Sequence, residues 1–131
     1  MLGIGVMIQS LGGNEETVKA VKGSLGKTIA SLALVDDILT LGFTDETKLS
    51  FSDEGQSCCE HRYMTTGDDL SSFVGAQFTD VELREAPSLE VGYGEHEVQF
   101  LVISTDRGNV TVETHNEHNG YYGWFWICAR N

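Results

Sequence analysis

Residues 98–115 read VQFLVISTDRGNVTVETH, and this stretch gives the strongest signal for the fold. Its first six residues include only one polar side chain, which is typical of a strand buried on both faces. The DRGN that follows is a hairpin-turn sequence. Val110 and Val112 then alternate with polar residues, so the valines should face the core while Glu113 and His115 face the other way. The stretch therefore predicts an antiparallel hairpin.

The rest of the chain continues the β pattern. Apolar residues recur through residues 28–51 and are interrupted by turn signals at 36–37 and 45–47, which predicts an antiparallel meander. Further strands are expected around residues 78–83 and 121–129. Residues 85–95 hold the only proline and two glycines, so we expect a surface loop there.

Two short helices are expected beside these strands. Asn14 is suited to cap a helix whose first turn holds two glutamates and which continues to about Lys22. A second short helix is expected within residues 66–75. The sequence thus predicts a single α+β domain, with about six or seven antiparallel strands and two short helices. Residues 1–25 would form an amino-terminal arm and short helix, and residues 26–131 the α+β domain.

The charge balance narrows the classes of partner. Twenty acidic side chains against eight basic ones give a net charge of −12, so the average surface repels duplex nucleic acid and anionic membranes. The same surface is suited to mimic nucleic acid or to dock on a basic protein. An acidic protein-interaction module is therefore one hypothesis for the function.

The compartment is expected to be the cytoplasm. The three cysteines are an odd number, and adjacent Cys58 and Cys59 pair with each other only in a strained geometry, so reduced thiols are expected. The apolar amino terminus is short and no basic region precedes its apolar residues, which disfavours a signal peptide. No apolar run reaches the ~20 residues of a transmembrane helix.

The densest polar chemistry lies at residues 115–123, between two expected strands. Imidazole, carboxamide and phenol groups can stack on a nucleobase and read its edge, so this segment is a candidate ligand site. Its candidate residues are His115, Asn116, His118, Asn119, Tyr121 and Tyr122. The plainer alternative is a tight turn at Asn119-Gly120 followed by two sheet aromatics.

A second polar cluster, residues 56–63, includes Cys58, Cys59, Glu60, His61 and Arg62. Arg62 is the cation expected beside a ligand, although half of a surface ion pair is the alternative. The histidines and cysteines admit a metal site, but their spacing fits no common zinc pattern. A cysteine nucleophile helped by His61 is a further alternative, which sequence neighbourhood alone does not support. We expect the two polar clusters to meet on one sheet.

Several short motifs, taken in order, resemble those of a family of small phage and prophage proteins. The resemblance runs from about residue 26 to residue 127. Its motifs are Gln56-Ser57-Cys58-Cys59-Glu60, Asp68-Asp69-Leu70, Phe73-Val74-Gly75, Phe100, Thr105-x-x-Gly108-x-Val110-Thr111-Val112 and Asn119-Gly120-Tyr121-Tyr122. Some members of that family are anti-defence sponges that capture the cyclic ADP-ribose and cyclic oligonucleotide signals of the Thoeris and CBASS immune systems.

The resemblance implies a cytoplasmic protein of the host cell that forms dimers or hexamers. It further implies that a small nucleotide signal binds between subunits, without catalysis or a cofactor, with Phe100 as a stacking ring and Asn119, Tyr121 and Tyr122 as the shared motif. In the sponges, an Arg and a Trp stand where this chain has Glu113 and Thr114. Because a carboxylate repels phosphate, this departure predicts that the chain binds a different ligand from the sponges, or none.

Overall fold

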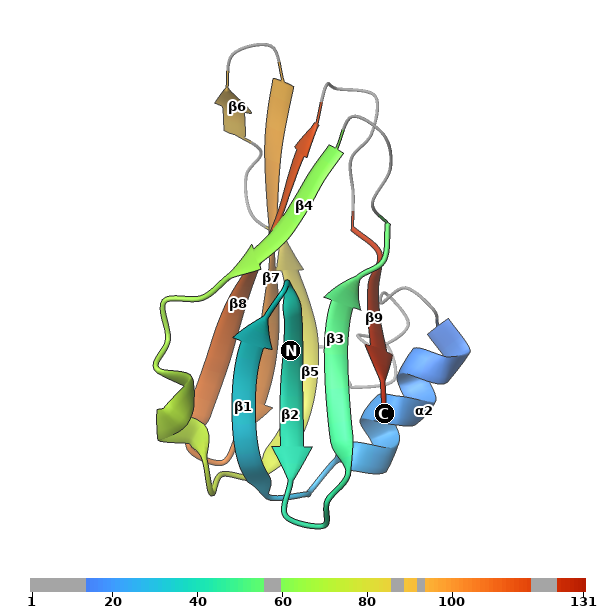
Figure 1. The fold of residues 1–131 in the computed structure, drawn as a ribbon, viewed down its shortest axis with the longest axis vertical. Helices are drawn as coiled ribbons and strands as arrows, with labels where there is room; N and C mark the ends of the chain where they lie inside the picture. The colour runs from blue at the N-terminus through green and yellow to red at the C-terminus, as the bar shows by residue number, and fades with distance from the viewer. Residues whose placement is uncertain (1–13, 56–59, 86–88, 92–93, 119–124) are drawn as a thin grey trace.

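Two antiparallel sheets packed face to face make up most of the protein, where the sequence predicted one sheet (Figure 1). The structure is a computed structural model that describes residues 14–55, 60–85, 89–91, 94–118 and 125–131. The arm expected at residues 1–13 lies outside these ranges. No helix within them is long and apolar enough to cross a membrane.

The four-stranded sheet has the order β1-β2-β3-β9. Its strands are β1 (Ile29–Val35), β2 (Ile38–Phe43), β3 (Lys48–Asp53) and β9 (Ile127–Arg130). The meander expected from residues 28–51 is confirmed, and its first turn places Asp36 and Asp37 at φ 51° and 62°. Two successive positive φ values match the twist of a two-residue hairpin. The fourth strand comes from the far end of the chain.

The five-stranded sheet has the order β4-β8-β7-β5, with β6 paired to β7. Its strands are β4 (Glu60–Thr65), β5 (Phe78–Glu85), β6 (Leu89–Val91), β7 (Gly94–Thr105) and β8 (Gly108–His118). The predicted hairpin is confirmed: β7 and β8 pair in register from Glu95↔His118 to Thr105↔Gly108. The turn residue Gly108 has φ 117°, a conformation that favours glycine. Val110 and Val112 are fully buried, as predicted.

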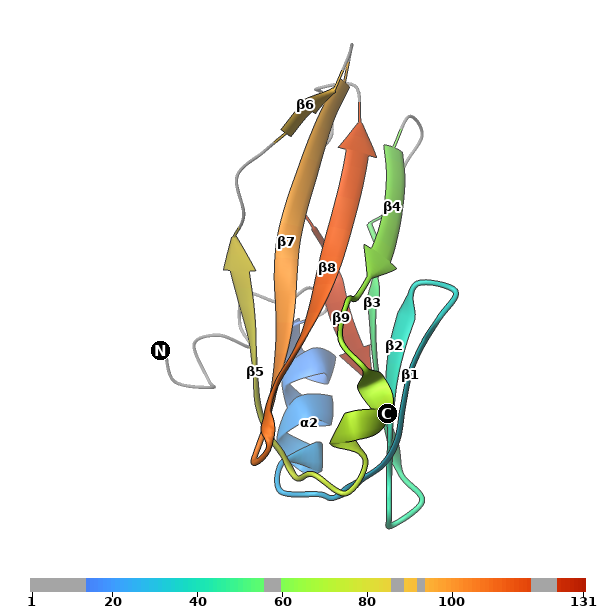
Figure 2. The ribbon, with the colours of Figure 1, turned by 90° about the vertical axis from the view of Figure 1, so that its left-hand side faces the viewer.

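Two helical segments flank the space between the sheets. The helix α2 (Asn14–Ser24) lies between the sheets on the side of β9 and contributes Ala20 and Val21 to the core (Figure 2). On the opposite side, the second expected helix is only a 3-10 turn, η1 (Leu70–Phe73), capped by the carboxylate of Asp69. The described ranges therefore hold nine strands, one α-helix and one 3-10 turn, which corrects the predicted six or seven strands and two helices.

Strand β9 and strand β6 also differ from the expectation. β9 begins at Ile127, and the earlier part of the strand expected at 121–129 falls partly outside the described residues. The expected loop at 85–95 contains the short strand β6 and the start of β7. The five-stranded sheet extends past the end of the four-stranded one (Figures 1 and 2).

Candidate functional site

The extending part of the five-stranded sheet carries most of the predicted site residues that the structure describes. We call it the polar end: residues 60–65 of β4, 113–118 of β8 and 96–99 of β7. Its register makes Tyr63, His115 and Val98 cross-strand neighbours, with Arg62 and Asn116 in the adjacent row. Because successive side chains point to opposite faces, these two rows lie on opposite sides of the sheet. One face continues the core, and the other is turned away from it.

The outer face of the polar end is a surface of aromatic rings. The rings of Tyr63 and His115 are stacked, with centroids 4.5 Å apart and an interplanar angle of 6°. His61 lies 4.8 Å from Tyr63 on the same face, and His96 lies 5.1 Å from His115. His115 is only 9% exposed, whereas His61 is exposed. Three strands thus bring four rings together.

Hydrogen bonds hold these rings in place. Nε2 of His96 lies 2.8 Å from Nδ1 of His115, and Nε2 of His115 lies 2.8 Å from the hydroxyl of Thr65. At least one of the two imidazoles must be neutral, since two protonated rings have no acceptor nitrogen. The phenol of Tyr63 donates to a carboxylate oxygen of Glu117 at 2.6 Å. These hydrogen bonds fix the orientations of three of the four rings.

The same contacts shift the pKa values of three side chains on the outer face. Burial and the neighbouring His96 lower the pKa of His115, although Glu113 and Glu117 oppose them. Burial, helped by Glu117, raises the pKa of Tyr63 to about 12. The bond from Tyr63 lowers the pKa of Glu117. At neutral pH the face therefore presents a largely neutral His115 and a phenol, bordered by two carboxylates.

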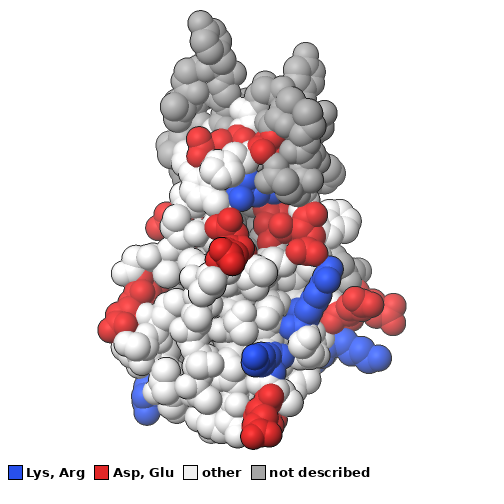
Figure 3. Space-filling model, in the orientation of Figure 1, with Lys and Arg blue, Asp and Glu red and all other residues white. Residues whose placement is uncertain are grey.

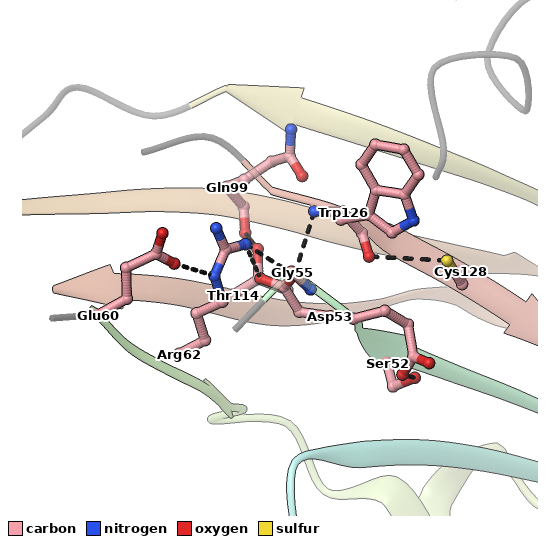
Figure 4. Close-up of polar contacts among 10 residues, drawn as sticks. Ser52, Asp53, Gly55, Glu60, Arg62, Gln99, Thr114, Trp126 and Cys128 are labelled. Atoms are coloured by element: carbon pink, nitrogen blue, oxygen red, sulfur yellow. Dashed lines mark hydrogen bonds and ion pairs between the residues drawn. The ribbon is translucent and has the colours of Figure 1, made fainter. Parts of the chain in front are cut away.

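The inner face of the polar end holds a buried ion cluster (Figure 4). Arg62 donates to both carboxylate oxygens of Asp53, at 2.8 and 3.0 Å, and its Nε donates to Glu60. The side chains of Arg62, Asp53 and Glu60 are only 5%, 6% and 2% exposed. Asp53 belongs to β3 and Arg62 to β4, so this cluster joins the two sheets above the hydrophobic core.

Other groups close around this cluster. The backbone N–H of Trp126 donates to Asp53, and a side chain at Gly55 would meet the Arg62 guanidinium at 2.7 Å (Figure 4). Burial alone would lower the pKa of Arg62, but the hydrogen bonds with Glu60 and Asp53 outweigh burial and raise it. On the same face of the sheet, the His118 imidazole lies 3.5 Å from the carboxylate of Glu97. These contacts enclose the inner cluster between the two sheets.

The structure separates the predicted site residues into two groups. Arg62, Asn116, His118 and Glu60 lie on the inner face and are enclosed. The interpretation of Arg62 as a ligand-facing cation is not supported, and its alternative of a surface ion pair is wrong because the pair is buried. His115, His61 and Phe100 lie on the outer face, with Phe100 opposite Glu113. Five other candidates fall outside the described residues: Cys58, Cys59, Asn119, Tyr121 and Tyr122.

The two polar clusters were expected to meet, and their described edges do. Glu60 and His118 are cross-strand partners at the end of the β4–β8 ladder. The pairing continues through Arg62 and Asn116 to Tyr63 and His115. The segments that follow Gly55 and His118 lie outside the described residues.

The ligand-binding residues predicted from the sequence did not include Tyr63, His96 or Glu117, although His96 was among the possible metal ligands. Alternation within two strands could have identified Tyr63 and Glu117. In His61-x-Tyr63-x-Thr65 and in Glu113-x-His115-x-Glu117, three polar side chains lie on one face of a strand. What the sequence lacks is the register that sets these rows side by side with His96 of β7. Within the described residues, no group of three or more His, Cys, Asp or Glu side chains could hold a metal ion.

Residues 22–126 match a family described as a domain of unknown function (DUF7448). No curated protein and no solved structure matches the chain.

Proposed function

Because the chain belongs to the DUF7448 family, whose description gives no activity, we propose from its own geometry that it is a non-enzymatic protein that captures a small nucleotide signal. The ligand class is a cyclic nucleotide or an ADP-ribose derivative, and its binding surface is the outer face of the polar end. The observation that carries the proposal is the parallel stack of Tyr63 on His115, 4.5 Å apart, with His61 and His96 beside it.

A ring surface of this kind suits a nucleobase. Every base has a flat π face, and stacking of a base on an aromatic side chain contributes roughly 1–3 kcal/mol. His61 is exposed and Tyr63 is half-buried, so both can be contacted from solvent. The hydrogen bonds to Glu117, Thr65 and His96 fix the rings, which reduces the entropy that binding must overcome.

The charges of the face indicate which part of a nucleotide it would contact. Glu113 and Glu117 border the rings, and carboxylates accept hydrogen bonds from ribose hydroxyls and base amino groups but repel phosphate. Arg62 does not offset them, because it points to the inner face and is bound to Asp53 and Glu60. We therefore expect the nucleoside portion on the rings and the phosphates directed away from them.

Isothermal titration calorimetry against cyclic dinucleotides, cyclic trinucleotides and ADP-ribose derivatives tests the proposal. For a ligand that binds, Tyr63→Ala should weaken the Kd roughly 5- to 150-fold, the equivalent of the stacking free energy. Tyr63→Phe keeps the ring and loses only the bond to Glu117, so it should stay close to wild type.

Trp126→Ala is the matched control, since Trp126 is an aromatic residue, 53% exposed, that lies outside the polar end. Its affinity should equal that of wild type. Absence of heat with every member of the panel would refute the proposal, and so would equal losses in Tyr63→Ala and Trp126→Ala. Native mass spectrometry of protein purified from its host would identify a co-purified ligand by its mass.

A further inference from the structure

Strand β1 lies at an edge of the four-stranded sheet, and half of its outer edge has unpaired backbone groups. Val35 and Ile38 flank the two-residue turn to β2, so they form a hydrogen-bonded pair. Because the direction of the backbone groups alternates along a strand, Leu34 and Leu32 direct their N–H and C=O groups away from β2. Within the described ranges, these groups form no hydrogen bond. We call residues 32–34 the open edge.

The other half of the same edge is already paired. The N–H of Ile29 donates to the carbonyl of Ala76 at 2.8 Å, and the carbonyl of Ile29 accepts from the N–H of Gly75 at 2.8 Å. Thr28 and Gln77 form an antiparallel bridge beside them. The paired segment ends near Gly75, close to the 3-10 turn η1. The open edge therefore begins where a neighbouring strand stops.

The edge strands β9, β4 and β5 are protected in a way that β1 is not. In each of them a side chain accepts a hydrogen bond from a backbone N–H: Thr17 from Ala129 at 3.1 Å, Asp37 from Met64 at 3.1 Å and Asp80 from Val81 at 2.8 Å. These strands also carry charged side chains, whereas none of the seven residues of β1 is charged or a proline. An edge without such protection is a template for pairing with another chain.

The side chains around the open edge are apolar. Leu34 is partly buried against the core, and so are Leu70 and Phe73 of η1, which packs against β1. Val35 and Val74 are 62% and 43% exposed, which is high for large apolar side chains. A strand added here would cover part of this apolar surface, which favours its binding.

The charges near the open edge are mainly negative. Asp36 and Asp37 form the turn at one end of it, and Asp68 and Asp69 directly precede η1. Arg107 contacts the other end of η1, but the carboxylates outnumber it. Figure 3 shows an area without charged side chains over β1, with acidic side chains above it and to its upper left, in the orientation of Figure 1. These charges favour a partner that carries Lys or Arg.

We propose that the open edge binds an extended, basic segment of a partner protein as an additional strand. Its backbone would pair with the N–H and C=O groups of Leu32 and Leu34. Because side chains alternate along a strand, every second residue of the segment would pack beside Leu34 and η1, and the others would face solvent. We therefore expect apolar residues to alternate with Lys or Arg. The open edge and the rings of the polar end belong to different sheets, so this contact requires no nucleotide.

Amide hydrogen exchange measured by NMR, with a short synthetic peptide of alternating valine and lysine, tests the contact. The amides of Leu32 and Leu34 should exchange roughly 10-fold more slowly when the peptide is present at about ten times its Kd. The same peptide with glutamate in place of lysine is the charge control and should give no protection.

Two N-methylated peptides test whether the backbone pairs. Only every second residue of an added strand directs its N–H toward β1. Methylation of the valine nitrogens or of the lysine nitrogens should therefore weaken the Kd by roughly 10-fold or more, and methylation of the other set should leave it unchanged. The set that matters reports whether the peptide runs parallel or antiparallel to β1.

Variants of Ala33 give the matched test on the protein. Ala33 is exposed on the solvent side of β1, so a longer side chain fits there. Ala33→Lys should weaken the Kd of the lysine peptide roughly 2- to 5-fold, and Ala33→Glu should strengthen it. Thr79→Lys adds the same charge at an exposed position of β5, in the other sheet, and should bind like wild type. Circular dichroism checks that all three variants fold.

Several outcomes would overturn the proposal. They are unchanged exchange at Leu32 and Leu34, equal effects of the two N-methylated peptides, and equal effects of Ala33→Lys and Thr79→Lys. Protection of both amides at high protein concentration without peptide would also overturn it, because a second copy of the chain would then occupy the open edge.

Discussion

The two faces of the polar end are built from alternate residues of the same strands, yet they have opposite properties. On the inner face, Arg62 is nearly buried and its donors are directed at two carboxylates. On the outer face, Tyr63 stands one residue further along β4 and is half-buried within a layer of rings. The difference shows that a high density of polar residues in a sequence does not distinguish a partly exposed polar surface from a buried ion cluster. The direction of each side chain does.

The largest expected effect comes from breaking the inner face. Arg62→Met removes a cation that contacts both Asp53 and Glu60, and it leaves both carboxylates enclosed. Loss of one partner from a buried ion pair typically lowers the free energy of unfolding by about 3–5 kcal/mol. Thermal and urea unfolding measure the loss.

Arg130→Met is the control for that change. Its ion pair with Glu54 joins side chains that are 66% and 36% exposed, so its removal should lower stability by less than about 1 kcal/mol. Adding Asp53→Asn and Glu60→Gln to Arg62→Met should recover part of the lost stability, because the remaining groups are then neutral. Equal effects of Arg62→Met and Arg130→Met would contradict a structural role for the inner cluster.

A smaller effect is expected when one hydrogen bond of the outer face is removed. Thr65→Val keeps the shape of the side chain and deletes the partner of His115 Nε2, so the free energy of unfolding should fall by about 0.5–1.5 kcal/mol. Thr79→Val is the matched change on β5, where the threonine is exposed and makes no side-chain hydrogen bond within the described ranges. Equal stabilities of the two variants in urea would show that the Thr65 bond contributes nothing.

Acid should gradually lower the stability that the outer face contributes to the fold. The folded protein lowers the pKa of His115 below 6.5 through burial and His96, so the unfolded chain binds this proton first. Stability should therefore be full above pH 6.5 and fall as the pH drops from 6.5 through the folded pKa. His61, His96, Glu113 and Glu117 face the same group, so imidazole NMR titration is needed to assign the change. A His115 resonance that titrates at or above 6.5 would contradict the expectation.

Alkali should also lower the stability of the outer face, through Tyr63. Its pKa of about 12, against 10 for a free phenol, means that the neutral form is favoured in the folded state. The associated stability is present below pH 10 and is lost as the pH rises through 12. The difference between the ultraviolet titrations of wild type and Tyr63→Phe isolates this phenol. In Glu117→Gln the pKa should fall but stay above 10, because burial is the larger cause; an unchanged pKa would remove Glu117 from the explanation.

Local signals in the sequence predicted the hairpins. Alternation and turn residues identified β1 to β3 and the β7–β8 pair, where the partner strand follows within a few residues. They did not predict two sheets, because the division depends on β9 pairing with β3 and β8 pairing with β4, across long separations in the chain. Nothing in a strand's own residues specifies a distant partner.

For the candidate site too, the sequence predicted the direction of side chains within a strand but not the contacts between strands. Alternation in β8 correctly directed His115 and Glu113 away from Val112 and the core. The stack with Tyr63 and the contact with His96 depend on the registers of β4 and β7, which are tertiary facts. Arg62 was misjudged for the same reason, since its partner Asp53 belongs to the other sheet.

The turn between β1 and β2 has a consequence for engineering. Its two aspartates adopt a backbone conformation for which Asn-Gly would be the better sequence, so a designer would be tempted to graft that pair. The carboxylate of Asp37, however, accepts a hydrogen bond from the backbone N–H of Met64, in the other sheet, at 3.1 Å. Replacing the two aspartates by Asn-Gly would therefore improve the turn itself but remove this hydrogen bond. The change would weaken the contact between the edge strand β4 and the four-stranded sheet.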